Sequence, residues 1–235
     1  MKNKLFLITS LLFTMMCSSQ VKVYTPSSSG KAKEDNSYKW VVKTDLFGYV
    51  SGEFPIAFEY RLAQKFSVEA SAGVTYAFFP NESIFGNNDS NNDSSYDTKA
   101  ALGSAFRGTF KYYPSSDYDA IEGWFFGIQA FTKTTNREYT TNNYTTTTPS
   151  TFEGKKDSKN KTGLSLIIGK QLFQDSNIAF ESFIGIGLAN VNREYYTNTS
   201  TYDSTTSTYI SSIDLVKTNE TIPNFQLGFK IGFGN

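Results

Sequence analysis

The residues of this chain that could do chemistry are carboxylates, amines and hydroxyls, because the sequence holds no histidine and a single cysteine, Cys17. A serine or carboxylate activated by histidine is therefore excluded. The carboxylates that fall within stretches of alternating apolar and polar residues are Asp45, Glu59, Glu69 and Glu181. The same polar positions carry the bases Lys43, Arg61, Arg107, Lys111 and Lys230. A carboxylate pair for acid-base catalysis is conceivable, but the nearly balanced charges predict a paired network. The absence of histidine, and of cysteine from the predicted mature chain, predicts a protein that is not an enzyme.

The sequence contains no phosphate-cradling loop and no cluster of transition-metal ligands, so we expect no cofactor. The stretch from Pro80 to Tyr96 is rich in Asn, Asp and Ser, and it lacks Lys and Arg. Its oxygen ligands could hold calcium weakly, but their spacing lacks the terminal glutamate of a calcium loop. We therefore expect a solvated anionic loop at this stretch and no metal site.

Phe225–Phe233, close to the C-terminus, shows the pattern of the elements that must position the charges. Every second residue is large and apolar, and the residues between them are polar or glycine, which is the period of a β-strand. The same alternation predicts eight strands, within 40–49, 54–62, 66–78, 102–112, 124–130, 163–169, 178–188 and 225–233. The connections after the second, fourth and sixth strands are compact, whereas three of the others are long and polar.

Alternation alone leaves open whether the apolar face meets lipid or fills the interior, as it does in a soluble lipocalin-like barrel. Three features favour lipid. Nine glycines lie on the polar face, where an eight-stranded barrel has little room: Gly73, Gly103, Gly127, Gly163, Gly169, Gly185, Gly187, Gly228 and Gly232. Near the compact connections the apolar face ends in a girdle of aromatic residues: Trp40, Tyr60, Phe66, Tyr112, Trp124 and Phe233. The charges on the polar face nearly cancel, as enclosed ions require.

The N-terminal residues have the pattern of an export signal. Lys2 and Lys4 precede an apolar run from Leu5 to Met16, so we expect a signal peptide at 1–19 that is removed near Ser19. Lipidation at Cys17 is the alternative, although the residues before Cys17 lack the small side chain that a lipoprotein site prefers. A flexible periplasmic leader at 20–37 and one barrel domain at 38–235 would follow.

Composition narrows the partners and the way in which the chain could cross a membrane. The formal net charge is zero, which argues against a nucleic-acid partner. Beyond the signal peptide no segment approaches the roughly 18 uninterrupted apolar residues of a spanning helix. Any membrane crossing must therefore use strands.

Several short runs carry a family resemblance. They are Lys43–Phe47, Ile56–Arg61, Phe66–Glu69 and Ala105–Tyr113 closed by Pro114. In these runs the chain resembles the small OmpA- and OmpX-like outer-membrane β-barrel family over roughly Tyr38 to Phe233. The resemblance implies an all-β, eight-stranded antiparallel up-and-down transmembrane barrel with short periplasmic turns and long extracellular loops. It also implies a monomer in the outer membrane of a Gram-negative cell, with lipid around it and with a C-terminal strand that the barrel-assembly machinery recognises.

For function, the sequence predicts a closed barrel with a structural or cell-surface interaction role, because side chains fill an eight-stranded lumen. The alternative is a narrow porin-like channel or transporter for a small solute. The motif Asn-Arg-Glu-Tyr occurs at 136–139 and again at 192–195, before tracts of Thr, Tyr, Asn and Ser. These tracts could extend the strands as a protruding sheet or form mobile loops, and both interpretations stay open. An extracellular partner would bind at the 134–160 and 192–218 loops.

Overall fold

The computed structural model describes residues 38–76, 97–115, 120–140, 154–174, 177–205 and 208–235. The chain divides into two units, Met1–Asn36 and Ser37–Asn235, and the described residues belong to the second unit. The signal peptide predicted at 1–19, the leader predicted at 20–37 and the anionic loop predicted at Pro80 to Tyr96 lie outside the described residues. Those three assignments stay predictions.

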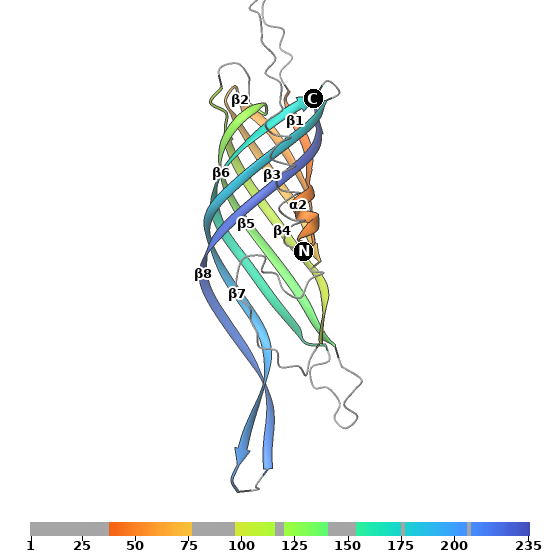
Figure 1. Ribbon diagram of the computed structural model, residues 1–235, viewed down its shortest axis with the longest axis vertical. Coiled ribbons are helices and arrows are strands. Elements are labelled where there is room, and N and C mark those ends of the chain that lie inside the picture. Colours follow the sequence, from red (N-terminus) through yellow and green to blue (C-terminus); the bar gives the residue numbers. More distant parts are fainter. Residues whose placement is uncertain (1–37, 77–96, 116–119, 141–153, 175–176, 206–207) are drawn as a thin grey trace, which may run out of the picture. The chain divides into compact units, whose positions relative to one another are not determined.

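Alternating apolar and polar residues form eight strands, which pair antiparallel in sequence order. They are β1 (Trp40–Asp45), β2 (Glu53–Ala63), β3 (Phe66–Tyr76), β4 (Asp97–Tyr112), β5 (Gly123–Thr140), β6 (Lys156–Gln174), β7 (Ile178–Asp203) and β8 (Thr208–Gly234). Because β1 also pairs with β8, from Val41 opposite Gly234 to Asp45 opposite Lys230, the sheet closes into a barrel (Figure 1). The prediction of eight antiparallel strands in up-and-down order is confirmed.

In the barrel most large apolar side chains of the strands point outward and most charged ones point inward, although Phe125, Ile167 and Phe183 are apolar residues of the interior. Ile56, Leu166 and Phe225 are 67%, 63% and 72% exposed, whereas Glu59 and Lys111 are fully buried. In the last strand Lys230 is buried, and Phe225 and Leu227 are exposed. The barrel therefore has the opposite arrangement to a lipocalin-like soluble barrel, which fills its interior with apolar residues.

The continuation of the first strand differs from the prediction. β1 ends at Asp45, and the residues expected to extend it form the short helix α2 (Leu46–Val50). The Asp45 carboxylate accepts hydrogen bonds from the backbone N–H groups of Phe47 (3.0 Å) and Gly48 (3.4 Å), which caps the start of the helix. Among the described residues, no helix has the length and apolar character needed to cross a membrane.

The last two strands are much longer than predicted. β7 and β8 pair without interruption from Ile178 opposite Phe233 to Asp203 opposite Thr208. For the segment 192–218 the sequence left a protruding sheet and mobile loops open, and the structure has strands at 192–203 and 208–218, which is the extended sheet. In Figure 1 this hairpin projects from the end of the barrel opposite the C-terminus.

Two borders limit the apolar outer surface. The six girdle aromatics lie at the end with the compact turns, where Trp40 is opposite Tyr60 and Phe66 is opposite Tyr112. Toward the other end, the outward side chains of four neighbouring strands become polar at one level, in a row that we name the polar row: Thr132, Thr162, Asn190 and Thr221. The part of β4–β8 beyond this row is named the distal sheet.

Candidate functional site

Six side chains from six strands meet inside the barrel. We name them the charge cluster: Lys43 of β1, Glu59 of β2, Glu69 of β3, Lys111 of β4, Glu181 of β7 and Lys230 of β8. All six are buried, and side chains from so many strands meet only at the barrel centre. The alternation within each strand aims every one of them inward.

The three lysines and three glutamates of the charge cluster interlock. The Lys111 Nζ lies 3.0, 2.8 and 2.9 Å from Oε2 of Glu59, Glu69 and Glu181. Lys43 also forms ion pairs with all three carboxylates, and its Nζ lies 2.6 Å from Oε2 of Glu69. Lys230 joins Glu69 at 2.6 Å and Glu181 at 2.9 Å. Equal numbers of opposite charges make the cluster neutral, which is the condition under which buried ions are tolerated.

Neutral side chains make further hydrogen bonds with the charge cluster. Glu59 accepts hydrogen bonds from the Tyr113 hydroxyl at 2.7 Å and from the Ser67 hydroxyl. Lys43 donates to Oε1 of Gln171 at 3.0 Å. Lys111 also lies 4.5 Å from the centre of the Phe125 ring, which attracts its positive charge. These contacts connect the strands to one another across the barrel interior.

The carboxylates of the charge cluster have a spacing that metal ions accept. Oxygen atoms of Glu59, Glu69 and Glu181 lie within 4.8 Å of one another. Their contacts are with lysine ammonium groups, so a metal ion would have to displace the lysines. The arrangement neutralises three buried lysines with three buried glutamates.

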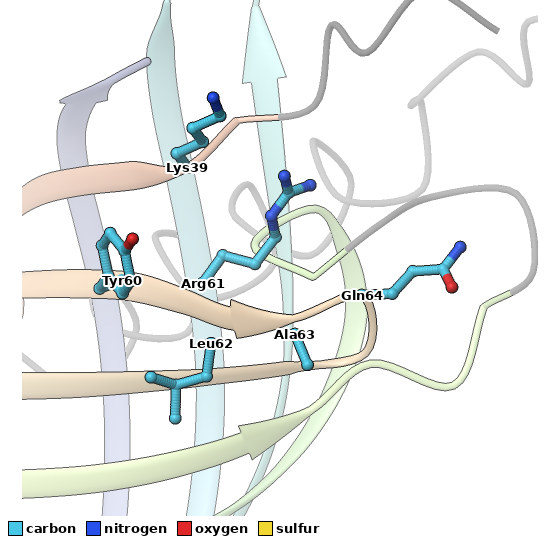
Figure 2. Close-up of a pocket in the computed structure, with 6 residues that line it drawn as sticks. All are labelled: Lys39, Tyr60, Arg61, Leu62, Ala63 and Gln64. Carbon is cyan, nitrogen blue, oxygen red and sulfur yellow. The ribbon is translucent and has the colours of Figure 1, made fainter.

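The structure brings six of the nine charges predicted as one network into direct contact. Asp45, Arg61 and Arg107 lie outside these contacts, although Asp45 is opposite Lys230 and interacts electrostatically with Lys230 and Arg107. Asp45 caps α2 and accepts a hydrogen bond from the Phe229 N–H at 3.4 Å. Arg107 forms an ion pair with Glu53. Arg61 lies at the end with the compact turns and lines an open hollow with Lys39, Tyr60, Leu62, Ala63 and Gln64 (Figure 2).

Several interior residues were missed in the sequence. Glu53, Tyr113 and Gln171 have the same inward parity as the charge cluster, so the alternation itself could have identified them, whereas Ser67 lies on the polar face of the predicted strand 66–78. Glu53 and Gln171 lie beyond the predicted strand limits, and Tyr113 follows directly after β4. The alternation continues across those limits and gives all three an inward parity.

The two Asn-Arg-Glu-Tyr motifs lie on strands that flank β6 in the distal sheet. The inward Arg193 binds Asp157 of β6 through two hydrogen bonds, of 3.2 and 2.8 Å. Arg137 is opposite the same Asp157. The glutamates of both motifs point to the other face: Glu194 meets Lys217 at 2.6 Å, and Glu138 meets Lys99 and Lys156.

Two tyrosines connect β5 and β7 just beyond the first residue of β6, Lys156. The Tyr139 hydroxyl donates to the backbone carbonyl of Tyr196 at 3.2 Å and accepts from its N–H at 3.1 Å. A side chain of β5 thus makes the hydrogen bonds that β7 would otherwise make with β6.

Hydrogen bonds from Lys99 and Lys156 lower the pKa of the neighbouring Glu138 below its ordinary value.

The fold and the interior define an all-β protein whose single sheet of eight antiparallel strands forms a ring around a neutral charge cluster. A family model described as "Protein of unknown function (DUF3575)" matches residues 11–218, so the chain belongs to this family. The match ends within β8, at residue 218, and includes both Asn-Arg-Glu-Tyr motifs. No curated protein and no solved structure matches the chain.

Proposed function

We propose that this protein is a small, monomeric outer-membrane β-barrel of the OmpA- and OmpX-like kind. In this proposal the charge cluster closes the barrel, and the barrel holds the distal sheet at the cell surface for interaction with a partner. One observation carries the proposal, namely that a continuous apolar outer surface lies between the aromatic girdle and the polar row. Water-soluble proteins rarely expose so many contiguous large apolar side chains.

The height of the apolar surface suits a membrane. On β5 the outward residues run from Trp124 of the girdle to Thr132 of the polar row. These eight steps rise about 26 Å along the strand at about 3.3 Å per residue, and strand tilt reduces the vertical height somewhat. The apolar band of outer-membrane barrels is about 25 Å tall. Aromatic residues at its lower border favour the lipid interface.

The connections support one orientation in that membrane. The turns after β2 and β6 lie at the girdle end. The first and last residues of the barrel domain meet there as well, where the Lys39 N–H donates to the Asn235 carbonyl at 2.7 Å. In outer-membrane barrels the short turns are periplasmic. The distal sheet would then lie outside the cell, and β8 would present the C-terminal signal to the barrel-assembly machinery.

The charge cluster favours a closed barrel over the alternative of a narrow channel. Eight lysine-glutamate contacts shorter than about 3 Å cross the interior. A solute would have to break several of these contacts together, and separating buried ion pairs is unfavourable by several kcal/mol for each group. Closure leaves the distal sheet as the part that can interact.

Planar-bilayer recording tests closure. The folded protein, purified in detergent and added to a planar bilayer, is expected to give no steady single-channel steps, while a general porin in the same bilayer gives them. A heat-unfolded sample of the same protein serves as the matched control for detergent artefacts. Steady steps from the folded sample alone would favour the channel over the closed barrel.

A further inference from the structure

The inward charges change in character at the polar row. Below it, the charge cluster is neutral. Beyond it, the inward side chains of β5, β6 and β7 include five bases, which we name the basic array: Lys133, Arg137, Lys159, Lys161 and Arg193. Among the described residues, three acids lie near the array: Asp157, which binds Arg193; Glu53 of β2, whose Oε2 lies 3.6 Å from the Lys133 Nζ; and Glu220 of β8, at the end of the Lys133 row. The five bases therefore outnumber the acids.

The register of the strands places like charges directly opposite each other. Lys133 of β5 faces Lys161 of β6, and Lys159 of β6 faces Arg193 of β7. Directly opposed like charges destabilise a sheet. Such pairs are the arrangement expected where a protein binds anions, because one anionic group can then contact two cations.

The surroundings of the basic array strengthen its attraction for anions. Phe131, Thr135 and Val191, on the same inner face, are buried, so the array lines an enclosed surface. The Lys133 side chain is 25% exposed and the Arg193 side chain 32%. Charges that are partly withdrawn from water interact more strongly than charges on an open surface.

Two opposed pairs lie in successive inward rows of the sheet. Lys133 and Lys161 form one row, and Lys159 and Arg193 form the next, two residues further along the strands. Two residues span about 7 Å along a strand. We infer that the mouth of the barrel binds a small multivalent anion, whose phosphate, sulfate or carboxylate groups are spaced about 7 Å apart.

This inference deepens the proposed function and rests on it only for placing the array at the cell surface. The charge cluster beneath the array gives the site a closed floor, so the anion is bound rather than passed through the barrel. The ligand chemistry has two sources, phosphate esters and acidic sugars. Tripolyphosphate, a sulfated disaccharide and digalacturonate represent them.

Isothermal titration calorimetry on the full folded chain in zwitterionic detergent tests the inference. At least one of the three probes is expected to bind, with an affinity that falls as salt is raised. The probe that binds identifies the source. The triple variant Lys133→Gln, Lys159→Gln, Lys161→Gln should weaken binding by about tenfold or more, because it removes both opposed pairs.

The matched control removes three lysines from the outer face of the same strands: Lys99→Gln, Lys156→Gln and Lys217→Gln. This variant has the same net charge as the inner one and should change binding by less than about twofold, since its cations point away from the array. Equal weakening by the two triples, or no binding of any probe by the unmodified protein, would overturn the inference.

A second variant tests the site even if the triple variant of Lys133, Lys159 and Lys161 misfolds. Glu220→Gln keeps every lysine and removes the carboxylate at the end of the Lys133 row. It should tighten binding by about twofold to threefold, and unchanged or weaker binding would contradict the site. Binding in detergent does not depend on membrane seating or on closure, so failure here is distinct from failure of the proposed function.

Discussion

Glu59 shows at the scale of single residues why the interior charges act as one unit. Its carboxylate contacts Lys43 and Lys111, and it accepts hydrogen bonds from Tyr113 and Ser67. Each lysine in turn contacts further carboxylates, so removing any one charge leaves another uncompensated. An unpaired charge in a dry interior is far more costly than the net gain from the pair.

Lys111→Met tests this unit. Methionine keeps most of the side-chain volume but leaves three glutamates facing two lysines, so we expect the free energy of unfolding to fall by about 3–5 kcal/mol. Urea titration of the folded band on a gel measures it. Lys217→Met removes a lysine whose side chain is 65% exposed beside Glu194, and it should cost no more than about 1 kcal/mol. Similar losses for the two variants would show that the cluster does not act as a unit.

The charged residue types predicted part of this interior, and their positions in the strand alternation predicted which face of the sheet they occupy. Lys43, Glu59 and Lys111 could be assigned to one face because their neighbours along the strand are apolar. The separation of Arg107 and Arg61 from the cluster could not be predicted, because the height of a residue in a barrel depends on the register between strands. Single-strand alternation contains no information about that register.

At the scale of elements, the sequence predicted which segments are strands better than where they end. The apolar stretches of β2–β6 stand out by their alternation. The outer ends of β7 and β8 do not, because Thr, Tyr, Asn and Ser lie on both faces there and no apolar face marks the period. The helix α2 was missed because Leu46 continues the apolar face of Val42, although Phe47 and Tyr49 are large apolar residues at the parity of Lys43, and the Asp45 cap begins a helix there.

Tyr139→Phe tests how the distal sheet is held together. The variant removes the hydroxyl that bonds both backbone groups of Tyr196 and keeps the ring. Two lost hydrogen bonds correspond to about 1–2 kcal/mol of local stability. Amide hydrogen exchange at Tyr196 should therefore quicken by about fivefold to thirtyfold, while exchange at Ile184 within the barrel stays the same. Unchanged exchange at Tyr196 would mean that the hydroxyl does not bridge β5 and β7.

At the scale of the whole molecule, the account depends on which solvent meets the outer surface. Leu166 lies between the girdle and the polar row, and Asn160 lies beyond the row on the same face of β6; both are exposed. In a soluble protein the two positions would tolerate charge equally well. In a membrane the first faces acyl chains and the second faces headgroups or water.

Leu166→Arg and Asn160→Arg therefore form a matched pair. Arginine at mid-bilayer height is unfavourable by about 2–4 kcal/mol, and near the interface by about 0–1 kcal/mol. We expect the first variant to fold poorly into lipid vesicles and the second to fold nearly as well as the unmodified protein. The yield of the folded species in vesicles of increasing thickness measures the difference, and equal yields would argue against a lipid-facing band.

Heat-modifiability in isolated outer membranes tests the central claim most directly. We expect the chain to fractionate with the outer membrane, and unheated and boiled samples to migrate differently on a denaturing gel, because the closed strand ring resists detergent until heated. Recovery of the chain in the soluble fraction, with identical migration before and after boiling, would contradict it.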